Sequence, residues 1–95
     1  MTEITPRHRR IALVGAQEAD AARLLSAANH GTMKLQIRLA TRDLDEARAW
    51  LNQEDVDRRP FVLTIVDMAI GLAAARLTMV QHALQTFGPD AMLPG

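Results

Sequence analysis

The sequence contains no cysteine and no tyrosine, only one tryptophan and two phenylalanines. Without cysteine, disulfide bonds, thiolate metal ligands and thiol nucleophiles are excluded. So few aromatic residues leave little for stacking on nucleic-acid bases. The 11 acidic and 11 basic residues cancel, so no overall field attracts nucleic acid or an anionic membrane. These absences favour a neutral domain that depends neither on thiol chemistry nor on base stacking.

No uninterrupted apolar run approaches the roughly 18 residues of a membrane span, and the first residues lack the apolar segment of a secretory signal. A chain of 95 residues is long enough for one domain with a modest core. We therefore predict a single soluble, cytoplasmic domain over residues 1–95, with no membrane association. Residues 1–10 are predicted to be a flexible lead-in, and residues 88–95 an irregular tail.

Short apolar runs alternate with segments of helical spacing. Three runs predict β-strands that are buried or half-buried: Ile11–Gly15, Leu35–Ala40 and Phe61–Val66. Three segments predict helices, the second with a capping box at Asp43 and Glu46: Glu18–Asn29, Thr41–Leu51 and Gly71–Phe87. The order β-α-β-α-β-α predicts an α/β fold with a short parallel sheet in strand order 2-1-3 and helices on both faces.

Asp67 follows the third predicted strand, in the stretch FVLTIVDMAIG. Ligands and reactive groups gather beyond the carboxyl ends of parallel strands. Three interpretations of this carboxylate stay open. It could cap or anchor the following helix, accept a phosphoryl group or bind a metal, or belong to a rim that binds a partner protein.

Three stretches together resemble response-regulator receiver domains: RIALVGAQEADAARLLSAA, LQIRLATRDLDEARAWL and FVLTIVDMAIG. The resemblance implies a receiver-like or flavodoxin-like three-layer αβα fold, in which Asp67 would be the phosphoacceptor beside Mg²⁺. The pattern also departs from the family. Gly15 and Ala16 stand where receivers have two metal-binding acids, the proline after the aspartate is absent, and strands four and five are lacking. Glu18 and Asp20 lie nearby as candidate metal ligands, in positions that also suit pairing with the helix dipole. The resemblance therefore implies a shortened, degenerate receiver.

The predicted function is that of a non-catalytic regulatory module which binds proteins in bacterial-type signal transduction, such as a kinase or an effector of a two-component system. It needs no cofactor. Two alternatives stay open. One is a regulator phosphorylated at Asp67 with Mg²⁺, and the other is a small nucleic-acid or nucleotide binder that uses the basic arm PRHRR, Pro6–Arg10.

The third predicted helix has more apolar surface than one sheet face would cover. Its apolar residues span roughly half of the circumference, whereas covering one face needs a stripe about 100° wide. The third strand would also be an unprotected sheet edge. We therefore predict a homodimer in which the third strands pair antiparallel and the third helices close over the seam. The predicted interface consists of Leu63, Ile65, Leu72, Arg76, Met79, Val80 and Ala83.

Overall fold

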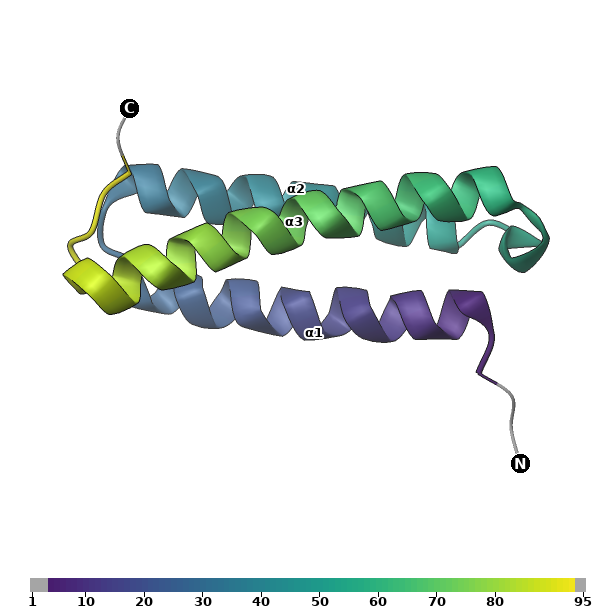
Figure 1. The fold of residues 1–95 in the computed structure, drawn as a ribbon, viewed down its shortest axis with the longest axis horizontal. Helices are drawn as coiled ribbons and strands as arrows, with labels where there is room; N and C mark the ends of the chain where they lie inside the picture. Colours follow the sequence, from purple (N-terminus) through teal and green to yellow (C-terminus); the bar gives the residue numbers. More distant parts are fainter. Residues whose placement is uncertain (1–3, 94–95) are drawn as a thin grey trace.

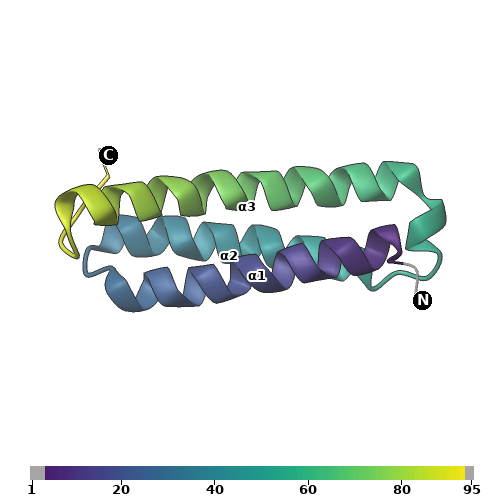
Figure 2. The same cartoon turned by 60° about the horizontal axis from the view of Figure 1, so that its bottom comes forward.

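The structure, a computed structural model, describes residues 4–93, and this part of the chain contains helices but no strand. α1 spans Pro6–Ala27, α2 spans Gly31–Leu51, the 3₁₀ helix η1 spans Val56–Arg58, and α3 spans Pro60–Phe87. α2 runs back along α1 and α3 runs back along α2, so the three long helices form an up-down-up bundle (Figures 1 and 2). The bundle is elongated and flat, with extents of 44 × 29 × 16 Å.

The predicted α/β receiver fold is wrong, because all three predicted strands are helical. Ile11–Gly15 lies inside α1, Leu35–Ala40 lies inside α2, and Phe61–Val66 forms the first turns of α3. The described residues therefore contain no parallel sheet of order 2-1-3. The absence of a receiver's strands four and five has no meaning for a helical bundle. The predicted helices are the later parts of α1, α2 and α3.

The packing of α2 shows why the strand prediction failed there. The strict alternation of Leu35, Ile37 and Leu39 is typical of a half-exposed strand, but only Ile37 of these three is buried. The buried residues instead recur in alternating steps of four and three, which is the spacing of a helix that packs against other helices. They are Met33, Ile37, Ala40, Leu44, Ala47 and Leu51.

α3 begins eleven residues before the predicted helix, at Pro60 rather than Gly71. Proline is favoured at the first helical position, because its fixed φ suits the helix and its missing N–H has no partner there. The run after it is rich in β-branched residues, which lowers helix propensity only slightly. Buried positions continue at helical spacing from this run along the rest of α3: Val62, Val66, Ala69, Ile70, Ala73, Leu77, Val80 and Ala83. Tertiary packing therefore overrides the local preference for a strand.

The ends of the helices have local causes. The hydroxyl of Thr5 accepts a hydrogen bond from the backbone N–H of His8 at 3.1 Å and caps α1. The lead-in therefore ends at Thr5, and its first three residues lie outside the described part of the chain. His30 caps the start of α2, where its Nδ1 accepts a hydrogen bond from the backbone N–H of Thr32. Gly88, with φ of 82°, ends α3, because this left-handed region disfavours residues with a Cβ.

The tail after α3 forms no helix over the described residues 88–93 and packs on the α1–α2 turn. The N–H of Asn29 donates to the carbonyl of Pro89 at 2.9 Å, and the N–H of Leu93 donates to the hydroxyl of Thr32 at 3.2 Å. Ala91 is buried. The predicted tail extends to Pro94 and Gly95, which lie outside the described residues.

The core is apolar throughout, and no polar side chain among the described residues is fully buried in it. Its largest completely covered side chains come mainly from α2, with additions from α1, η1 and α3: Met33, Ile37, Leu44, Leu51, Val14, Val56, Val66 and Val80. Trp50 packs against this core while remaining partly exposed. Since burying one large aliphatic side chain contributes roughly 1.5–3 kcal/mol, this core provides the main stabilisation of the bundle.

Candidate interaction surface

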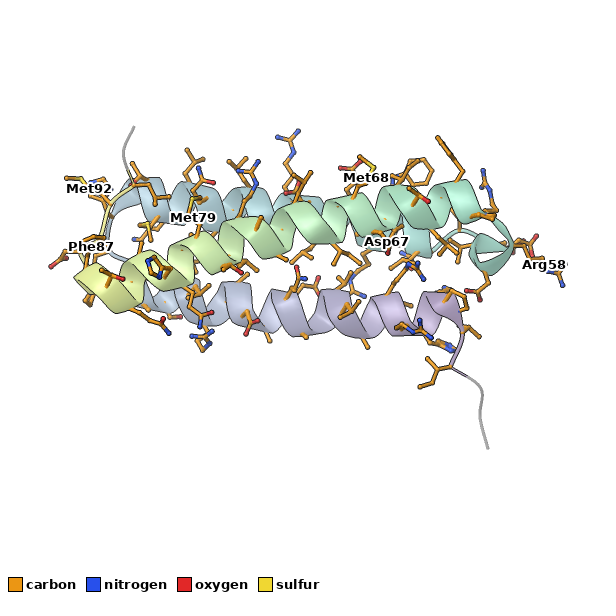
Figure 3. The ribbon with its side chains drawn as sticks, in the orientation of Figure 1. Arg58, Asp67, Met68, Met79, Phe87 and Met92 are labelled. Carbon is orange, nitrogen blue, oxygen red and sulfur yellow. The ribbon has the colours of Figure 1, made fainter. Side chains whose placement is uncertain are left out.

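α3 carries a second apolar stripe on its surface, in addition to the residues that it buries. We call it the outer stripe. Phe61 and Met68 are 78% and 65% exposed, and Leu72 and Met79 are 54% and 43% exposed. Figure 3 shows Met68 and Met79 on the edge of α3 that points away from α1, whereas Asp67 points toward α1. The outer stripe consists of Phe61, Ile65, Met68, Leu72, Ala75 and Met79.

The members of the outer stripe are separated alternately by four and three residues. This heptad spacing keeps one line of side chains facing a neighbouring helix in a left-handed pair. The inner residues of α2 have the same spacing and face the core. The outer stripe therefore has the pattern of a helix–helix contact, but no helix of the described chain covers it.

The two flanks of the outer stripe differ in chemistry. One flank is formed by Thr64, Gly71 and Thr78, which are exposed, small or short, and uncharged. On the other flank a shallow groove separates α3 from α2, where Asp43 and Glu46 face the outer stripe. Together these features form an apolar strip with one neutral border and one charged border.

The predicted dimer interface is only partly on this surface. Ile65, Leu72 and Met79 belong to the outer stripe. Val80 and Ala83 are buried in the bundle core, at 0% and 7% exposure, so neither lies on the outer stripe. Pairing of third strands is also wrong, because that segment is helical.

The remaining two predicted interface residues face other parts of the bundle. Leu63 is half-buried and packs against the core. Arg76 lies between α3 and α2, where its Nη1 donates to Oε1 of Gln36 at 2.9 Å and its Nε is 3.4 Å from Oδ2 of Asp43. Arg76 therefore joins the two helices at the edge of the outer stripe. The predicted capping box at Asp43 was wrong, because α2 starts twelve residues earlier.

Asp67 forms a two-pronged ion pair with Arg10 across α1 and α3. Nε and Nη2 of Arg10 donate to the two carboxylate oxygens at 2.7 and 2.8 Å. The hydrogen bond to Asp67 raises the pKa of the Arg10 guanidinium. Asp67 lies inside α3 rather than at its start, so it does not cap the helix. It links two helices.

The candidate metal ligands do not converge with Asp67. Both Nε and Nη2 of Arg48 donate to the carboxylate of Glu18, a contact that raises the pKa of Arg48. Asp20 pairs at 3.6 Å with Arg23, one turn along α1. Among residues 4–93, no three His, Asp or Glu side chains form a group that could hold a metal ion.

We expect Asp67→Asn to lower the free energy of unfolding by about 0.5–1 kcal/mol, because exposed ion pairs contribute little even with good geometry. Asp67 is 53% exposed, and Arg10 is mostly covered. Urea denaturation followed by circular dichroism measures the change, which should shrink at high salt. Asp20→Asn is the matched control. The Asp20–Arg23 pair is longer, at 3.6 Å, and lies within α1, so its loss should lower the free energy of unfolding less. Equal losses in the two variants would contradict a specific role of the Arg10–Asp67 pair.

The basic arm is the first part of α1, and two of its arginines are engaged within the bundle. Nε of Arg7 donates to the carbonyl of Leu51 at 2.7 Å, and its backbone N–H donates to Oδ1 of Asp57 at 2.7 Å. Arg10 holds Asp67. The arm is therefore part of the folded structure, and His8 and Arg9 are its exposed side chains that can carry positive charge.

By length and composition alone, α3 is able to cross a membrane. No uninterrupted apolar run predicts this property, because Asp67 and Arg76 divide the helix. Core helices of soluble proteins can have the same length and composition. In the bundle α3 packs against both other long helices, and its two charged residues pair with them.

Comparisons with protein-family models, with curated proteins and with solved structures gave no match to this chain. The resemblance to receiver domains therefore has no support from a relative, and the helical fold removes the sheet on which it depended.

Proposed function

We propose that this protein is a non-catalytic, cytoplasmic interaction module whose outer stripe binds a helix of a partner protein. The exposed heptad spacing of Phe61, Met68, Leu72 and Met79 carries this proposal. Soluble proteins rarely leave a large contiguous apolar patch uncovered unless it binds something. The proposal keeps the protein-binding role predicted from the sequence and gives up the receiver chemistry.

The dimensions and chemistry of the surface suit a helix better than an extended peptide. From Phe61 to Met79 the outer stripe is about 27 Å long, at 1.5 Å per helical residue. Helices that dock in grooves present anchors at the same alternating spacing. Met68 and Met79 add flexible side chains that adapt to a partner's shape. Since every backbone N–H in the middle of α3 is already used within the helix, recognition depends on side chains.

Photo-crosslinking in the native host tests this proposal. A photoreactive amino acid replaces Leu72 on the outer stripe in one variant and Ala19, an exposed residue on α1, in the control. We expect position 72 to give discrete covalent adducts with protein and position 19 to give none above background. Adducts at both positions, or at neither, would refute the proposal, because binding would then not be specific to the outer stripe.

A further inference from the structure

We infer that the outer stripe binds the outer stripe of a second copy, with the two α3 helices antiparallel about a twofold axis between Met68 and Leu72, at the middle of the outer stripe. This inference rests on the proposed function, since a second copy is one particular partner for the same surface. Three observations favour that partner: the order of the side chains, the neutral flank and the charges on α2.

The spacing of the outer stripe reads the same from both ends. Its steps of four, three, four, three and four residues are symmetric, so an antiparallel copy meets it in register. The pairs that follow are Phe61 with Met79, Ile65 with Ala75, and Met68 with Leu72 of the second copy. Each larger side chain then opposes a smaller or more flexible one, as a well-packed seam requires. A twofold pairing of identical patches is also the commonest closed assembly.

The neutral flank allows two copies to approach closely. In an antiparallel helix pair, the same flank of each helix meets across the axis, so Thr64, Gly71 and Thr78 would face the same flank of the second copy. In this register Gly71 faces Gly71 of the second copy, and Thr64 faces Thr78. None of the three carries charge, so no like charges repel. A Cβ at Gly71 would meet nothing within 4 Å in the single chain. Because Gly71 has no side chain, the two α3 helices can approach each other most closely near the twofold axis.

The charged flank distinguishes antiparallel from parallel pairing. Arg42 and Glu46 are exposed and one turn apart on α2, hence on the same face. Asp43 and Glu46 both border the groove beside Met68 and Leu72, so the turn of α2 from Arg42 to Glu46 lies level with the axis. Reversal of one copy would then bring Arg42 of each copy toward Glu46 of the other. A parallel pair would put each charge opposite its like, which is unfavourable.

The decisive variant is Gly71→Arg, compared with the wild type by sedimentation equilibrium over micromolar concentrations. We expect the wild type to have twice the mass of the 10.5 kDa chain. Gly71→Arg should weaken the dimer at least about tenfold, since it puts bulk and two like charges near the axis. The single chain should melt no lower, because arginine favours the helix more than glycine does and the site is open.

Gly15→Arg is the matched control. It makes the same change inside α1, where a Cβ also meets nothing within 4 Å, and it should leave the dimer intact. A wild type that stays monomeric, or equal weakening by the two variants, would overturn the inference. If photo-adducts at position 72 then contained a different protein, the proposed function would stand. If position 72 gave no specific adduct, both the proposed function and the inferred dimer would be refuted.

Cysteine scanning tests the orientation, since the natural chain has no cysteine. Phe61→Cys and Met79→Cys place thiols at exposed positions at the two ends of the outer stripe. With a short bifunctional thiol reagent, the antiparallel pair should give covalent dimers when the two variants are mixed and few with either variant alone. Efficient dimers from Phe61→Cys alone would indicate parallel pairing and overturn the antiparallel arrangement.

Discussion

Val80→Glu is expected to unfold the chain, whereas Met79→Glu at the next position should leave it folded. Val80 is 0% exposed in the core, and Met79 is 43% exposed on the outer stripe. A carboxylate at position 80 would have to be buried without a partner or protonated, at a cost of several kcal/mol. The total stability of a domain is only about 5–15 kcal/mol. The variant therefore loses much or all of its free energy of unfolding.

Far-UV circular dichroism and urea denaturation at low concentration measure this difference. Val80→Glu should lose most of the helical signal without denaturant. Met79→Glu should retain it and should only weaken association. If Val80 instead lay at the surface of the single chain, the variant would stay folded as a monomer. A folded Val80→Glu monomer would therefore show that α3 is rotated about its axis relative to the structure.

The sequence predicted helices correctly where the apolar spacing continued over several turns. Glu18–Asn29 and Gly71–Phe87 lie almost entirely within α1 and α3. The strands were wrong because each was inferred from five or six residues, and a run that short cannot separate a strand from a buried part of a helix. Following the pattern further would have favoured helix, since Ile37 belongs to a series of buried residues that runs from Met33 to Leu51.

The outer stripe was predictable in part. The excess apolar surface of the third predicted helix is visible in the sequence, and Leu72 and Met79, expected from it, lie on the outer stripe. Ile65 lies there too, although it was expected on a strand edge. The apolar pattern could not assign Val80 and Ala83, because α3 carries two apolar stripes side by side. Which of the two turns inward depends on the packing of α2 against α3, and no local pattern encodes that choice.

The role of Asp67 could not be predicted from neighbouring residues. Its partner, Arg10, is 57 positions away in the chain, and only the bundle brings the two together. The same holds for Asp43, whose spacing from Glu46 resembles a capping box but which faces Arg76 on another helix. Charged residues at helix–helix contacts are determined by tertiary structure, so short motifs describe them poorly.

Arg76 and Asp43 form an ion pair in which loss of either partner would leave the other charge largely covered and unpaired. The side chains are only 33% and 20% exposed. Oδ2 of Asp43 and Nε of Arg76 are buried and 3.4 Å apart, yet neither has a hydrogen bond of good geometry. The attraction is therefore mainly electrostatic, with Gln36 holding the guanidinium through Nη1. Either charge alone would be poorly compensated.

We expect Arg76→Met to lower the free energy of unfolding by about 2–3 kcal/mol, because it leaves Asp43 partly buried without its cation. The double variant Arg76→Met/Asp43→Leu should recover most of that loss, since an apolar pair of similar volume replaces both charges. Urea denaturation of wild type, both single variants and the double variant gives the coupling as a double-mutant cycle. All four proteins should carry Gly71→Arg, so that association does not contribute. If the two single losses simply added in the double variant, Arg76 and Asp43 would act independently. The contact between α2 and α3 would then depend on apolar packing alone.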